Sequence, residues 1–197
     1  MGHRHIKKLD LGQLEKGTIH KLWLDMATDT FGVPISIPLI VAKGVEDGPT
    51  LGLTAAIHGN ELNGIPVIQR VIKDLDVEHL RGTLIGVPGV NVLSLTRRKR
   101  RFIDGTDLNH IMPGKKNGNV SQVYAWRFFE RVVRNFDYMI DLHTASNGRI
   151  NSYYIRADMS DEITAKMALL QNPEIIVHNP PSDGTLMVLL MKLGYLR

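Results

Sequence analysis

The feature that most restricts the fold is a strand-like segment followed by a helix-like segment and then by a second strand-like segment. Residues 50–57 form a short, almost continuous apolar run, which is typical of a buried strand. Residues 61–75 carry apolar side chains at three- and four-residue steps (Ile65, Ile68, Ile72 and Leu75), which predicts a helix. Residues 83–87 again resemble a buried strand. This order predicts an α/β protein with parallel strands.

The same alternation continues to the end of the chain. Strands are predicted at 138–140, 153–155 and 175–177, and helices at 120–136, 161–170 and 185–193, the last closed by Gly194. The face of helix 120–136 that we expect to be apolar consists of Val123, Trp126, Phe129 and Val133. Residues 18–43 alternate polar and apolar side chains but contain Pro34 and Pro38, which favours short antiparallel or edge strands. We therefore expect a three-layer αβα fold with a mixed, largely parallel sheet, in which residues 1–45 form N-terminal strands and residues 46–197 the main domain.

Composition excludes several classes of protein. Hydrophobic residues make up 43% of the chain, which is typical of a globular domain. No apolar run reaches the roughly 20 residues that span a bilayer, so no membrane partner is expected. The polar start Met1–His5 lacks the apolar stretch of a secretory signal, and the cytoplasm is the expected compartment. Because the chain has no cysteine, any metal must be held by His, Asp or Glu.

A basic run at residues 97–101 lies in a Gly- and Asn-rich segment, 91–119, that we expect to be a long functional loop. One interpretation is a nucleic-acid patch; the other is a solvated loop, or one whose arginines face an anionic substrate. The second is favoured because no aromatic residues are interleaved with the charges. No nucleic-acid partner is therefore expected.

Three residues at predicted strand ends could bind a metal. His58 and Glu61 are three positions apart where a strand gives way to a helix, and His143 follows another strand. Open α/β sheets bind ligands beyond the carboxyl ends of their strands. Two histidines and a carboxylate are the ligands of several catalytic zinc sites. Asp141 faces the same side as His143 and is a candidate to orient it. Each of these residues alone is compatible with an ordinary structural role, whereas the placement of all three at strand ends favours a metal site.

Three motifs together resemble the succinylglutamate desuccinylase/aspartoacylase family, a branch of the zinc carboxypeptidase superfamily. They are His58-Gly59-Asn60-Glu61, Asp107-Leu108-Asn109 with Met112-Pro113-Gly114 close behind, and Asp141-Leu142-His143-Thr144. The resemblance implies a zinc-hydrolase catalytic domain with one Zn²⁺ on His58, Glu61 and His143. It also implies that the arginine before Phe102 polarises the scissile carbonyl, which indicates Arg101, with Arg100 as the alternative because the register within the basic run is open. Asn109 would contact a substrate carboxylate.

Two departures from the family pattern affect the expected function. The family sequence is Asp-Leu-Asn-Arg, whereas this chain has His110 in the last position, so the acidic substrate group gripped by that arginine is in question. The family's general base is a glutamate on a later strand, and no glutamate follows Glu174. The 46–197 domain is therefore expected to be incomplete at its C-terminus and inactive by itself. Its uncovered sheet edge would favour homo-oligomers.

The leading hypothesis is a zinc-dependent amidohydrolase that removes an acyl group from a small N-acyl amino acid or amine. Two alternatives keep the metal: a zinc carboxypeptidase acting on short peptides, and a non-catalytic zinc-binding remnant. A fourth hypothesis, a basic nucleic-acid binder, depends on residues 97–101 alone.

Overall fold

Six strands form one mixed sheet in the computed structural model, which describes residues 4–146, 148–180 and 186. Their order across the sheet is β1 (Arg4–Ile6), β2 (Thr18–Thr28), β3 (Pro34–Lys43), β5 (Arg81–Val87), β4 (Glu46–Ala55) and β6 (Tyr138–Leu142). β4 pairs in parallel with both β5 and β6, and β1 with β2, while β3 is antiparallel to β2 and β5. The mixed, largely parallel sheet expected from the sequence is confirmed.

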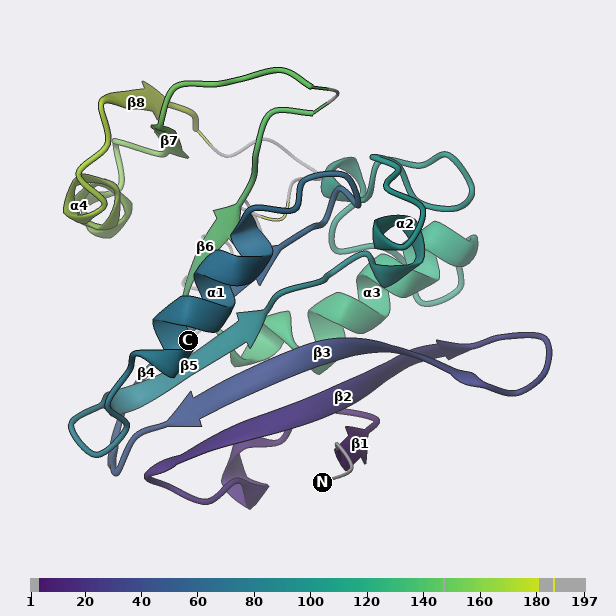
Figure 1. Ribbon diagram of the computed structural model, residues 1–197, viewed down its shortest axis with the longest axis horizontal. Helices are drawn as coiled ribbons and strands as arrows, with labels where there is room; N and C mark the ends of the chain where they lie inside the picture. The colour runs from purple at the N-terminus through teal and green to yellow at the C-terminus, as the bar shows by residue number, and fades with distance from the viewer. Residues whose placement is uncertain (1–3, 147, 181–185, 187–197) are drawn as a thin grey trace.

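Helices cover both faces of this sheet (Figure 1). On one face α1 (Gly64–Lys73) buries Ile68 and Ile72 against Leu53 and Leu84 of the central strands. On the other face α3 (Val120–Arg131) and the short helix η3 (Val133–Asn135) pack into a second, larger core. Because each face has its own apolar core, the three-layer αβα arrangement is confirmed.

The apolar face of α3 differs from the one expected. The helix buries Ser121, Tyr124, Ala125, Phe128 and Phe129, whereas Val123 and Trp126 are partly exposed. Of the four residues expected to be apolar and buried, Phe129 in α3 and Val133 in η3 are buried, so the expectation is confirmed for these two only. Tyr124 can be buried because its hydroxyl donates to the Val90 carbonyl, 2.7 Å away, and Trp126 instead lies beneath the ammonium of Lys116.

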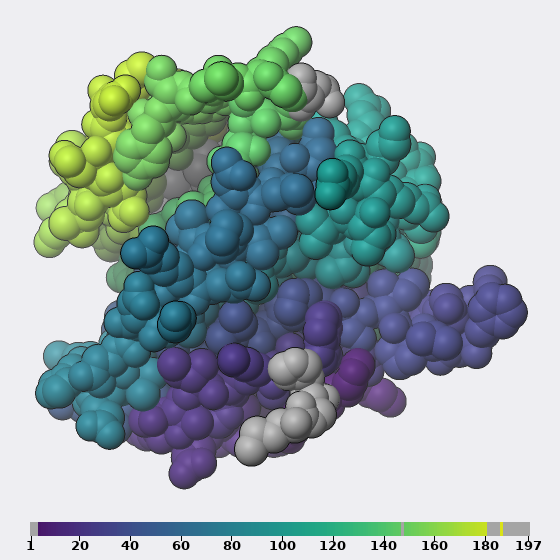
Figure 2. Space-filling view, viewed as in Figure 1, coloured from purple at the N-terminus to yellow at the C-terminus, as the bar shows by residue number. Residues whose placement is uncertain are grey.

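The strands near the N-terminus are longer than expected. β2 and β3 pair from Thr18–Lys43 to Thr28–Pro34 as one hairpin, whose tip projects beyond the rest of the surface in Figure 2. Pro38 is tolerated inside β3 because β5 pairs only with residues 40–43, so Pro38 lies where β3 has a single neighbour. The antiparallel pairing expected for residues 18–43 is therefore confirmed, whereas the expectation that these strands are short was wrong.

The last described elements form a separate small unit. β7 (Tyr154–Ala157) and β8 (Ile175–His178) pair in parallel as a two-stranded sheet, connected by α4 (Glu162–Leu170). The predicted helix 161–170 and strands 153–155 and 175–177 are confirmed within one or two residues. The predicted helix 185–193 and its Gly194 cap lie outside the described residues, except for Leu186, which is buried.

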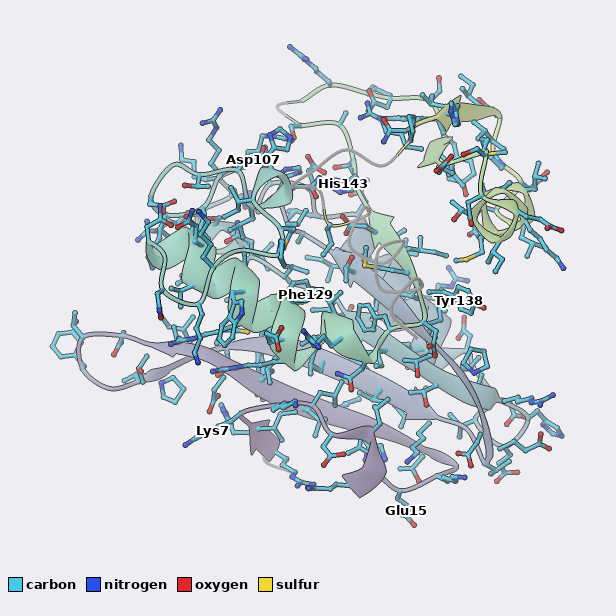
Figure 3. All side chains as sticks on the ribbon, turned by 180° about the vertical axis from the view of Figure 1, so that it is seen from behind. Lys7, Glu15, Asp107, Phe129, Tyr138 and His143 are labelled. Carbon is cyan, nitrogen blue, oxygen red and sulfur yellow. The ribbon has the colours of Figure 1, made fainter. Side chains whose placement is uncertain are left out.

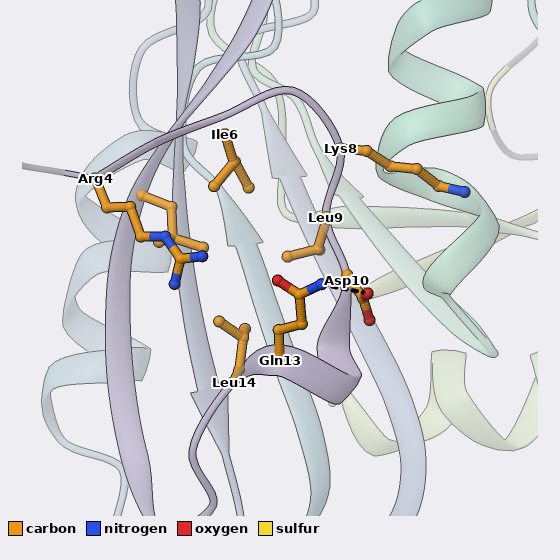
Figure 4. Close-up of a pocket in the computed structure, with 8 residues that line it drawn as sticks. Arg4, Ile6, Lys8, Leu9, Asp10, Gln13 and Leu14 are labelled. Atoms are coloured by element: carbon orange, nitrogen blue, oxygen red, sulfur yellow. Dashed lines mark hydrogen bonds between the residues drawn. The ribbon is translucent and has the colours of Figure 1, made fainter.

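A short segment before β2 closes the lower edge of the sheet. Here the 3-10 helix η1 (Leu11–Gln13) and β1 surround a cavity of about 20 Å³, lined by Arg4, Lys8 and Asp10 among others (Figure 4). That volume is large enough for about one water molecule. Within the described residues, no helix has the length and apolar character needed to cross a membrane.

Candidate metal centre

The two strands that end at the candidate site lie side by side. β4 and β6 pair in parallel as far as Ala55 and Leu142, so the segments that follow these two strands leave the sheet at the same end. After β4 the backbone turns, and the Glu61 amide donates to the His58 carbonyl at 3.0 Å. This turn brings both side chains to one side, as the three-residue spacing predicted, and both residues are 2% exposed. His143 follows β6 directly.

The three candidate ligands meet around the Glu61 carboxylate. His58 Nδ1 lies 3.0 Å from Glu61 Oε1, and His143 Nδ1 lies 2.9 Å from Glu61 Oε2. One donor atom from each residue falls within 4.8 Å of the other two. A metal ion could therefore be held by these three side chains together.

Each imidazole is held from behind by a second carboxylate. His58 Nε2 is 3.0 Å from Asp107 Oδ1, and His143 Nε2 is 2.7 Å from Asp141 Oδ2. Asp107 and His143 lie at the same edge of the molecule in Figure 3. When Nε2 carries the proton that each aspartate accepts, the Nδ1 lone pair of each ring is free to bind a metal.

The charges and hydrogen bonds of this cluster fit a divalent cation. His58 Nδ1 is buried and makes no directed hydrogen bond with any described residue, although Glu61 is within ion-pair distance. Among the described residues, three carboxylates (Glu61, Asp107 and Asp141) contact the two imidazoles, and one guanidinium, that of Arg100, lies against Glu61 and Asp107. With neutral imidazoles, two negative charges remain uncompensated. The buried, unpartnered nitrogen and this excess charge are what a bound cation would satisfy.

The pKa values of these groups are shifted by the same neighbouring charges and hydrogen bonds. Burial disfavours the charged form of Glu61, but hydrogen bonds with His143 and Ser146 and the close approach of His58 hold the pKa of its carboxyl well below its usual range. The hydrogen bond with His58 likewise lowers the pKa of Asp107. Against burial, the charge of Asp141 and hydrogen bonds with Asp141 and Glu61 raise the pKa of His143 to about 10. Protons and a metal ion compete for such nitrogens.

The basic loop contributes Arg100, and not Arg101, to this cluster. Arg100 donates to Glu61 Oε1 at 2.7 Å and lies 3.4 Å from Asp107 Oδ2. The Arg101 side chain is exposed and donates to the Gly105 carbonyl at 3.1 Å. The loop is held by α2 (Val92–Leu95), from which the buried Ser94 hydroxyl donates to the Arg101 carbonyl at 2.8 Å.

Asn109 and His110 occupy the short helix η2 (Leu108–His110), which Asp107 caps by accepting from the Asn109 amide at 3.1 Å. Asn109 Oδ1 accepts from the Leu186 amide at 3.2 Å. The His110 side chain is exposed. Neither side chain is among the groups that contact Glu61.

Two further residues at the cluster had no role assigned from the sequence. Asp107 is the first residue of the Asp107-Leu108-Asn109 motif, and membership of that motif is the sequence signal that could have identified it. Ser146 donates to Glu61 Oε1 at 2.6 Å and accepts from Arg100 at 2.8 Å. A serine in a loop after a strand carries no comparable signal in one sequence.

The mixed α/β sheet with helices on both faces is a fold that this chain shares with solved structures. An aspartoacylase family protein from Mesorhizobium loti superposes with a TM-score of 0.77 at 24% identity, covering 91% of this chain and 59% of that one. The product-bound ectoine utilization protein EutE (DoeB) from Ruegeria pomeroyi gives a TM-score of 0.74 at 22% identity, covering 92% and 58%. At these identities the solved structures establish the shared fold.

The chain belongs to the succinylglutamate desuccinylase/aspartoacylase family, because the model of that family's catalytic domain matches residues 47–196. It is also similar to the N-alpha-acetyl-L-2,4-diaminobutyric acid deacetylase of Halomonas elongata, with 37% identity over 116 residues. That match covers 58% of this chain and 33% of the relative. The chain thus spans a third of this curated relative and less than two thirds of the solved structures.

Proposed function

We propose that this protein is a zinc-dependent amidohydrolase that removes an acyl group from a small N-acyl amino acid or amine. The observation that carries the proposal is the pair of imidazoles whose Nδ1 atoms converge on Glu61 while Asp107 and Asp141 hold their Nε2 atoms. Two histidines and one carboxylate, with a fourth position open, are typical of catalytic zinc. Membership of a deacylase family supports the reaction type.

The side chains around the cluster divide the chemistry among them. When bound, zinc supplies Lewis acidity toward a carbonyl oxygen and makes water more acidic. Asp107 and Asp141 keep the imidazoles oriented. Arg100 takes the role first given to Arg101: its guanidinium is at the cluster, where it would stabilise the negative charge that develops on the carbonyl oxygen of a tetrahedral intermediate.

The nature of the substrate is supported by one relative and by one substitution. The Halomonas elongata relative is a deacetylase of N-alpha-acetyl-L-2,4-diaminobutyric acid, itself a small N-acyl amino acid. His110 stands where the family pattern has an arginine, and an imidazole cannot form two parallel hydrogen bonds with a carboxylate. We therefore propose that substrates without a tightly held acidic side group are preferred.

Zinc content is the first test of this function. The wild-type chain should carry about one zinc per molecule after purification, because three donors of the kind that zinc prefers converge. His58→Ala should lose most of it. Elemental analysis of both proteins measures this, with His79→Ala as the control, because His79 lies on the surface and pairs only with Asp76 among the described residues. Equal zinc in wild type and His58→Ala would contradict the site.

Substrate preference is the second test of the proposed function. kcat/KM is compared for N-acetylaspartate, N-succinylglutamate and neutral N-acyl amines. His110→Arg should raise kcat/KM for the two acidic compounds by about tenfold or more, since a hydrogen bond between charged groups contributes roughly 1.5–3 kcal/mol. A strong preference of the wild type for the acidic compounds, left unchanged in His110→Ala, would contradict the proposal.

A further inference from the structure

A buried hydroxyl lies behind the aspartate that holds His143. Thr54 is fully buried near the end of β4, and its side-chain hydroxyl donates to Asp141 Oδ1 at 2.5 Å. The two residues are direct partners in the parallel pairing of β4 with β6. This contact is therefore part of the sheet and does not depend on a loop.

The contact extends the chain of hydrogen bonds that ends at the metal-facing nitrogen. Thr54 occupies one oxygen of Asp141, and the other oxygen is the one that holds His143 Nε2, at 2.7 Å. We propose that Thr54 is a positioning residue for the metal centre: by fixing the carboxylate of Asp141, it fixes the His143 ring with Nδ1 turned toward Glu61 and the metal. This inference depends on the metal-binding part of the proposed function, and not on the identity of the substrate.

Thr54 is suited to this task for two reasons, one in its own side chain and one in the surroundings of Asp141. Its branched side chain is restricted about χ1, and complete burial in a strand restricts it further, so the hydroxyl has a defined direction. Asp141 is itself only 11% exposed at the side chain, so little water can replace a lost donor. Without the hydroxyl, Oδ1 would lose its hydrogen-bond donor among the described residues, and the carboxylate would be free to turn away from His143.

The affinity for zinc, measured by competition with a chromophoric chelator, tests the role. Thr54→Val keeps the branched shape and removes the donor, and it should weaken zinc binding about tenfold, the lower end of the effect of losing an orienting partner. Thr54→Ser keeps the hydroxyl and should bind within about threefold of wild type, since only a methyl group is lost. Thr50→Val is the matched control: it is the same substitution on the same strand, four residues from Thr54, and it should leave zinc affinity unchanged.

A double-mutant cycle separates positioning from a general effect on folding. If Thr54 acts through Asp141, Thr54→Val should have no further effect on zinc affinity in an Asp141→Asn background. Thermal unfolding of the zinc-free variants checks that each one folds, and Thr54→Ala provides a second donor-free variant should valine disturb the strand. Unchanged zinc affinity in the donor-free variants, or an equal loss in the Asp141→Asn background, would overturn the inference while leaving the zinc site intact. Absence of zinc from the wild type would overturn both.

Discussion

At the scale of single residues, two adjacent arginines have different surroundings. The Arg100 side chain reaches Glu61, Asp107 and Ser146, whereas the Arg101 side chain donates to the Gly105 carbonyl. The two side chains point to different partners, and of the two only Arg100 faces the cluster. Stabilisation of the developing oxyanion is therefore proposed for Arg100 alone.

This difference gives a prediction with a built-in control. Arg100→Ala should reduce kcat by about 10²–10³, the usual effect of removing one group that stabilises a developing oxyanion. Arg101→Ala should change kcat by less than about threefold, because its side chain faces solvent. Steady-state deacylation by the encoded protein is the measurement. Similar losses in both variants would contradict the assignment of Arg100.

At the scale of elements, the basic loop is positioned by a close contact between two backbone segments. A Cβ atom added to Gly59 would lie 2.3 Å from the Ser94 carbonyl carbon and 2.5 Å from the Leu95 nitrogen. The turn that carries His58 and Glu61 thus packs directly on α2, whose Ser94 holds the basic loop. The metal ligands and Arg100 are coupled through this contact.

Gly59→Ala should therefore destabilise the protein by about 1–3 kcal/mol, the typical cost of forcing extra atoms into a packed region. Gly89→Ala is the matched control, because a Cβ there would meet its nearest atom at 3.5 Å, an ordinary contact. Urea unfolding gives the free energy of unfolding of each variant. A Gly59→Ala variant as stable as Gly89→Ala would show that the two segments can separate at little cost.

At the scale of the whole molecule, the cluster joins three distant parts of the chain: the turn at 58–61, the loop at 100–107 and the segment 141–146. The carboxylates that reach it in the described part of the chain are Glu61, Asp107 and Asp141, and each already contacts an imidazole. None of them is free to transfer a proton between water and the leaving amine.

We therefore predict that the zinc-loaded 197-residue chain deacylates slowly. A positioned general base contributes typically 10²–10⁴-fold, and a rate lower by about this factor is expected relative to a full-length relative assayed alongside. The measurement is release of acyl group from a panel of N-acyl amino acids, with a chelator-treated sample as the control. Zinc-dependent turnover within about tenfold of the relative would show that one of these carboxylates, or another residue, serves as the base.

The sequence by itself determined the features that depend on local order. Strand and helix periodicities predicted the α/β layers, and the three-residue spacing of His58 and Glu61 after a strand predicted their convergence. His143 was placed beside them because parallel strands end at one edge of a sheet. Each of these inferences needs only neighbouring residues and the general geometry of sheets.

Only the tertiary structure decided which of several equivalent residues is used. The direction of Arg100 depends on the Ser94 hydrogen bond and the contact with Gly59, which residue spacing does not encode. The buried face of α3 depends on which carbonyl can receive the Tyr124 hydroxyl. The pairing of Thr54 with Asp141 joins positions 87 residues apart. Such contacts are set by packing between distant segments, and a single sequence has no local pattern that reports them.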